Sequence, residues 1–137
     1  MKKVVVPGIV AAIGMIAVAM IAGYLLNALF PSVKAEYENT NLFRPWDDPL
    51  MYLYFIEPFI LSIGFAWVWE KVKTLFQGSV IQKSFNFALI YWLVSAIPGM
   101  LMSVSSFKIS LLMTLTWTIS TFFQAWIASM IIVRMNK

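Results

Sequence analysis

The chain lacks cysteine and histidine altogether in its 137 residues. Without cysteine there is no disulfide framework, no thiol nucleophile and no iron–sulfur cluster. Without histidine there is no His-ligated zinc or haem, and the commonest general base in catalysis is missing. Only six acidic residues are present, and five of them fall near or outside the expected membrane interfaces. We therefore expect a protein that is not an enzyme and that holds no cofactor and no metal.

Charged residues are also scarce, at 12% of the chain, whereas 61% of the residues are hydrophobic. A soluble domain carries about 25% charged and about 45–50% apolar residues. A 15.6 kDa globule cannot bury so much apolar surface, because small domains have a high ratio of surface to volume. The surplus must face a lipid bilayer. The net charge of +4 does not indicate a nucleic-acid partner, because the basic residues are scattered at the ends of apolar runs.

Long apolar runs predict four transmembrane helices. Each run can cross a hydrocarbon core about 30 Å thick, and none shows the alternation of a barrel strand. The expected spans are residues 4–30, 49–70, 82–104 and 109–133. The first run is too long for the 7–15-residue core of a signal peptide, so we expect it to remain as a span. The predicted fold is all-α: one transmembrane domain, residues 1–137, forming a four-helix bundle with short loops and one longer outer loop, residues 31–48.

The basic residues indicate the orientation of the bundle. Seven of the ten fall on one side of the expected membrane, and Lys34, Arg44 and Lys108 fall on the other. Cytoplasmic loops are enriched in lysine and arginine. With an even number of spans, both termini lie on the same side. We therefore expect a multi-pass protein of the cell membrane with both termini in the cytoplasm.

The second span contains one acid, Glu57, followed directly by Pro58. The apolar run is centred near residue 59 or 60, which places Glu57 about 4 Å from the midplane. An ionised carboxylate at that depth costs at least about 2.5–3.5 kcal/mol. No lysine or arginine lies within another apolar run, so we expect the neutral acid. Pro58 has no N–H and frees the carbonyl of Tyr54, to which a protonated Glu57 could donate.

Two interpretations of this acid remain open. One is a structural acid at a proline kink, and the other is a proton, cation or substrate site, because acids inside membranes are functional candidates. The candidate site residues are Glu57, Tyr54, Tyr91, Ser95, Thr114, Thr118 and Thr121. The three threonines follow spacings of four and three and share one helix face. Kinks are predicted at Pro58, Pro98 and Gly99.

Small residues predict close helix packing. The candidates are Gly8, Ala12, Ala19 and Gly23 in the first span, and Gly64 on the face of Glu57 in the second. Small residues at four-residue spacing let helix backbones approach closely in membranes. The contact is either internal to the bundle or made with a second copy or another membrane protein. The favoured function is a non-enzymatic membrane subunit acting through helix packing. The alternative is an oligomeric, proton-coupled carrier or channel for small solutes that uses Glu57.

Overall fold

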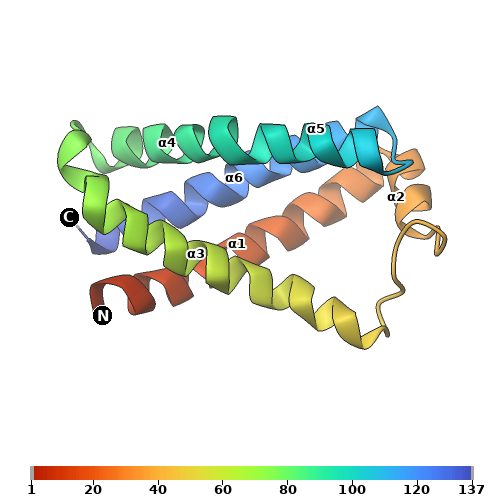
Figure 1. Cartoon of the computed structure of the whole chain (residues 1–137), viewed down its shortest axis with the longest axis horizontal. Helices are drawn as coiled ribbons and strands as arrows, with labels where there is room; N and C mark the ends of the chain where they lie inside the picture. The colour runs from red at the N-terminus through yellow and green to blue at the C-terminus, as the bar shows by residue number, and fades with distance from the viewer. Residues whose placement is uncertain (1, 137) are drawn as a thin grey trace.

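The structure is a computed structural model, and it describes residues 2–136. Its regular elements are all helical in that part of the chain. Four helical units are long and apolar enough to cross a membrane: Lys2–Leu29, Pro49–Leu75, Val80–Ser106 and Leu111–Met135. The all-helical class and the four apolar helices predicted from the sequence are therefore confirmed (Figure 1).

The first and fourth of these units are single α-helices, α1 (Lys2–Leu29) and α6 (Leu111–Met135). The second and third units each combine α-helix with another helix type. The second joins η1 (Pro49–Met51), α3 (Tyr52–Val72) and η2 (Lys73–Leu75). The third joins α4 (Val80–Tyr91), a π-helical segment η3 (Trp92–Ala96) and α5 (Ile97–Ser106). A short helix, α2 (Pro31–Tyr37), lies between the first two units.

Side-chain caps fix where the helices begin. Ser79 and Gln82 form a capping box at the start of α4, and Ser110 accepts a hydrogen bond from a backbone N–H in the first turn of α6. Asp48 does the same at η1. Such caps satisfy N–H groups that have no partner within the helix. Gly78 precedes the α4 cap with φ of 98°, a conformation that favours glycine.

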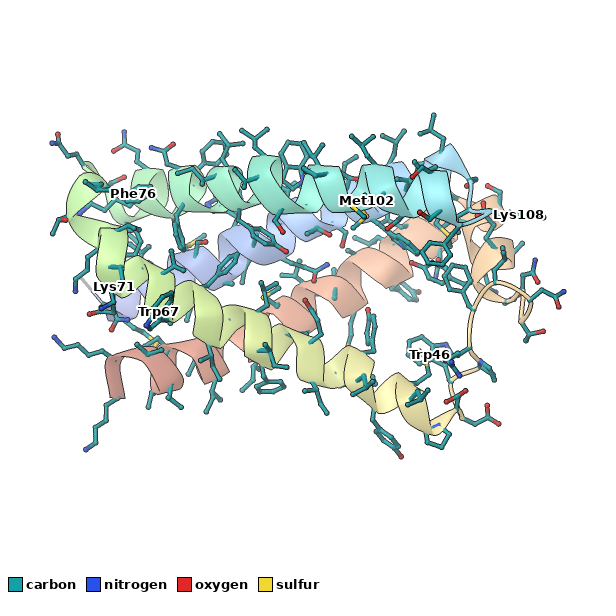
Figure 2. All side chains as sticks on the ribbon, viewed as in Figure 1. Trp46, Trp67, Lys71, Phe76, Met102 and Lys108 are labelled. Atoms are coloured by element: carbon teal, nitrogen blue, oxygen red, sulfur yellow. The ribbon has the colours of Figure 1, made fainter. Side chains whose placement is uncertain are left out.

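In the bundle, α1 packs between α3 and α6, and α4 packs on α6. Figure 1 shows α1 and α3 crossing, with both chain termini at one end of the molecule. We call this the terminal end, and the opposite end, which carries α2, the loop end. Figure 2 places Lys71 and Phe76 at the terminal end and Trp46 and Lys108 at the loop end.

Small residues set how closely α1 approaches its neighbours. A Cβ on Gly8 would lie 2.7 Å from the Cα of Ile63 in α3. Ala11 and Ala12 beside it are completely buried. On the α6 side, a Cβ on Gly14 would lie 2.7 Å from Cδ1 of Ile131. The backbone of α1 therefore approaches both neighbouring helices at positions that have little or no side chain.

An aromatic core and the chain ends hold the terminal end together. The rings of Phe65, Trp69 and Phe87 pack edge to face, with centroids 5.4–5.5 Å apart. The buried Trp69 indole donates to the carbonyl of Asn136 over 3.1 Å. The Asn136 amide in turn donates to the carbonyl of Lys3 over 2.6 Å. These bonds link α3, the end of α6 and the start of α1.

At the loop end, part of the predicted loop 31–48 is helical. Pro31 occupies the first position of α2, where its fixed φ suits a helix and its missing N–H costs little. Val33 of α2 is buried. Glu36 accepts a hydrogen bond from the backbone N–H of Ser110 over 2.9 Å, so a carboxylate lies at the N-terminus of α6. These contacts dock α2 on the bundle.

Candidate functional site

The carboxyl of Glu57 lies on an exposed part of α3 and has no hydrogen-bond or ion-pair partner among the residues that the structure describes. Glu57 is five residues from the midpoint of the Pro49–Leu75 helix, or about 7.5 Å along its axis. Within residues 2–136, four other carboxylates form a hydrogen bond or an ion pair, whereas the carboxylate of Glu57 forms neither. The acids with a partner are Glu36, Glu38, Asp48 and Glu70. The bond to the Tyr54 carbonyl suggested by the sequence is not among those present.

Two tyrosines lie within electrostatic range of this acid. Tyr54 is one turn away in α3, and Tyr91 comes from the end of α4. The hydroxyl of Tyr91 also lies beside Ser95 in the π-helical segment. The structure therefore brings four of the predicted site residues toward one region. The ring of Tyr91 is anchored there by Phe65, with centroids 4.7 Å apart.

The predicted threonine stripe satisfies itself within α6. The hydroxyls of Thr114, Thr118 and Thr121 each donate to the carbonyl four residues earlier, over 3.0, 2.7 and 2.8 Å. Such bonds within a helix remove the hydroxyl donors from other uses. No interaction in the described residues joins these threonines to Glu57.

The third unit is irregular where Pro98 follows the π-helical segment. Pro98 lies near the start of α5 and has no N–H to donate to the preceding turn. The indole of Trp92 donates to the carbonyl of Thr118 over 2.7 Å and ties the irregular segment to α6. Ser95 and Gly99 are exposed, and a Cβ built on Gly99 would meet no neighbouring atom of the described residues within 4 Å. Short π segments occur often at functional sites.

The predicted packing residues fall into two groups. Gly8 and Ala12 lie buried where α1 meets its neighbours, and Ala19 is half-buried. Gly23 and Gly64 have open space where a Cβ would be, with no neighbouring atom within 4 Å. Any close packing at these two glycines therefore requires another molecule.

The exposure of α3 changes along its length. All six residues 52–57 are exposed, whereas Ser62, Ala66 and Trp69 are buried. Figure 1 shows α3 running away from α4 toward the loop end. The first six residues of α3, at the loop end, are thus exposed on every side of the helix, including the side that carries Glu57.

A continuous exposed row begins in η1 and runs down the face of α3 opposite its buried side. Its members are Leu50, Leu53, Glu57, Ile60, Gly64 and Trp67, which we call the α3 seam. Leu53, Ile60 and Trp67 are 59%, 70% and 57% exposed. The spacings alternate between three and four residues, which is the repeat of helices that pack as coiled coils. Sequence analysis found Glu57 and Gly64 on this face and missed the other four, although their spacing was visible.

A pocket of about 330 Å³ lies at the loop end, with Lys34 and Arg44 in its wall. Both cations face acids: Lys34 is 3.8 Å from Glu38, and Arg44 is 2.8 Å from Asp48. A hydrogen bond from the backbone N–H of Leu50, and then the contact with Arg44, hold the pKa of Asp48 below its ordinary value. The positive charge of the pocket is therefore already balanced.

The geometry thus singles out an uncovered acid on an uncovered helix face within a candidate membrane span. Its surroundings combine two tyrosines with the exposed row of the α3 seam. Comparison of the chain with models of protein families, with curated proteins and with solved structures finds no match.

Proposed function

We propose that this chain is a non-enzymatic membrane subunit that packs against a further transmembrane segment along the α3 seam. The observation that carries the proposal is Glu57, an exposed acid in a helix that can span a membrane, with no partner within residues 2–136. Lipid tails offer no hydrogen bonds, so an uncovered polar group within the bilayer is unfavourable. A second protein surface over Glu57 removes that cost.

The rest of the bundle supports a partner from outside the chain. The lysines and arginines of the four helical units lie toward the helix ends, so none reaches Glu57 as a counter-ion. The threonine hydroxyls of α6 are already bonded within their own helix. Gly64 adds an opening on the same face, where a second helix can approach closely.

Single-cysteine cross-linking in native membranes tests this proposal, because the chain contains no cysteine of its own. Leu53→Cys and Ile60→Cys, both on the α3 seam, should give one adduct of constant mass. Tyr52→Cys and Phe55→Cys serve as controls, since these residues are exposed on other faces of α3. Absence of a constant adduct from every seam position would contradict the proposal.

The orientation belongs to the same proposal. We place both termini on the cytoplasmic side of a cell membrane, because seven of the ten basic residues belong to the terminal end of the bundle. Figure 2 shows Lys71 from the larger group and Lys108 from the smaller group at opposite ends of the bundle. A cysteine added after the last residue should resist a membrane-impermeant thiol reagent in intact cells, and labelling there would reverse the assignment.

A proton-coupled carrier or channel for small solutes is the second candidate. It is favoured by the gathering of Glu57, Tyr54, Tyr91 and Ser95 beside a π-helical segment. An acid within a membrane-spanning helix is a candidate member of a proton relay. Purified chain in liposomes should then carry a proton or solute flux that Glu57→Gln abolishes. Liposomes without flux above that of empty vesicles would rule it out.

A further inference from the structure

We infer that the partner on the α3 seam is a second copy of this chain, related by a two-fold axis along the membrane normal. In this dimer the two α3 helices are parallel and the Glu57 carboxyls of the two copies meet. The inference rests on the proposed function, since it names the partner that the proposed packing requires. Three features of α3 support it.

The first feature is the spacing of the exposed residues. The six seam residues alternate at three and four, from Leu50 to Trp67, and all are exposed. At 100° per residue the five of them within α3 lie opposite Ser62 and Ala66, which face the bundle. An apolar row with a period of 3.5 residues packs against an equal row on a second helix, each residue entering a hole on the other. The seam therefore has the shape of one half of a parallel helix pair.

The second feature is the chemistry of the acid. A neutral carboxyl is both a donor and an acceptor, so two of them can satisfy each other with two O–H···O bonds. A two-fold axis along the membrane normal puts the same residue of both copies at the same depth. A second copy thus brings the complementary group to Glu57 without any basic residue. A polar group at one position of such a row also fixes the register of the two helices.

The third feature is Gly64, two turns along the seam from Glu57. The space where its Cβ would lie holds no neighbouring atom within 4 Å. A glycine at this position lets the backbones of the two α3 helices approach. Gly23 of α1 is equally open but has no acid in its helix, so it does not define a second such face.

Cross-linking of purified chain in liposomes tests the inference, because the only available partner there is the chain itself. Cysteines at Leu53, Ile60 and Trp67 should form disulfide adducts of twice the 15.6 kDa mass. Cysteines at Tyr52 and Phe55 should not, although both residues are exposed. Equal yields at seam and control positions, or no adduct at any position, would overturn the inference.

Substitutions at Glu57 test the carboxyl pair. Glu57→Gln keeps a donor and an acceptor on each copy and should dimerise like the parent chain. Glu57→Leu removes the donor and the acceptor and should lower the association constant of the dimer about tenfold, which corresponds to about 1.4 kcal/mol. Interhelical hydrogen bonds in membranes contribute about this much. Förster transfer between labelled copies measures the constant, and parent-like dimerisation of Glu57→Leu would refute the pair.

A matched pair of glycine variants tests the close approach. Gly64→Leu should abolish the dimer by holding the two helices apart, whereas Gly23→Leu should leave it intact. A Cβ built at either glycine meets no neighbouring atom of the described residues within 4 Å, so we expect both variants to fold like the parent chain. A dimer that persists in Gly64→Leu and is lost in Gly23→Leu would show that the interface lies on α1, and it would overturn the inference.

Failure of this inference is distinguishable from failure of the proposed function. A constant adduct in native membranes whose mass is not twice that of the chain, with none in liposomes, would refute the dimer alone. The subunit role would then stand with a different protein as partner. No adduct in native membranes or in liposomes would refute both.

Discussion

The crossing of α1 and α3 predicts the largest effect from one of the smallest substitutions, Gly8→Ala. The added methyl would lie 2.7 Å from both Cα and Cγ1 of Ile63. Carbon atoms pack best at about 3.5–4.0 Å, so the two helices must separate by roughly 1 Å. Cα of Ile63 belongs to the backbone and cannot rotate away. Trimming Ile63 to alanine would therefore relieve only the Cγ1 contact.

The size of the effect follows from comparison with Gly23→Ala. Replacing glycine by alanine in a helix gains about 0.8–1.0 kcal/mol of helix propensity at either position. Overpacking costs about 1–3 kcal/mol, and it applies only at Gly8, because Gly23 has open space around it. The gain in helix propensity is the same for both variants, so it cancels when their free energies of unfolding are compared. Gly8→Ala should thus be less stable than Gly23→Ala by about 1–3 kcal/mol.

Reversible unfolding in mixed micelles measures this difference. The parent chain, Gly8→Ala and Gly23→Ala are titrated with dodecyl sulfate and followed by tryptophan fluorescence, and the six tryptophans give a strong signal. Equal stability of the two variants would show that α1 and α3 are not in backbone contact at Gly8. The packing account of this crossing would then be wrong.

Two further predictions concern the loop end. The pKa of Asp48 is lowered by the N–H of Leu50 and then by Arg44, so its stabilising effect is present above the ordinary value of 3.8 and is lost as pH falls through the lower folded value. The Leu50 amide shift in an NMR titration should move only below about pH 3.8 and should not move in Asp48→Asn. Glu36→Gln should lower stability by about 0.3–1 kcal/mol, because it removes a negative charge at the N-terminus of α6 beside Ser110. Thermal unfolding equal to that of the parent chain would show that the charge does not contribute.

The four long apolar helices were predictable because their signal is summed over many residues. A run of some twenty apolar residues identifies a span, whatever its neighbours are. Caps such as the one that Asp48 forms before Pro49 were predictable for a different reason, because a cap depends on only a few adjacent residues. The helical part of the loop was missed because α2 is short and depends on the docking of Val33 and Glu36.

The candidate site was less predictable because it depends on how the helices cross. Gly8 and Gly23 belong to the same pattern of small residues, yet only Gly8 meets a neighbouring helix within the chain. The spacing of the α3 seam is present in the sequence. In a helix that is apolar on all sides, however, that spacing does not stand out from the rest. The seam became visible only when the structure showed which apolar residues are left exposed.

Replacing Tyr91 by phenylalanine separates the two proposed functions. The ring of Tyr91 packs on Phe65, and phenylalanine preserves that contact. Phe65 faces the bundle while the α3 seam faces away from it, so cross-linking at Ile60 should be unchanged in Tyr91→Phe. A relay from Glu57 through Tyr91 to Ser95 needs the hydroxyl, and its flux should be lost in the same variant. If both proteins cross-link normally at Ile60 and the parent chain carries no flux, the carrier is ruled out and the subunit function stands. Flux that Tyr91→Phe abolishes while cross-linking persists would establish the carrier, with the α3 seam joining its copies.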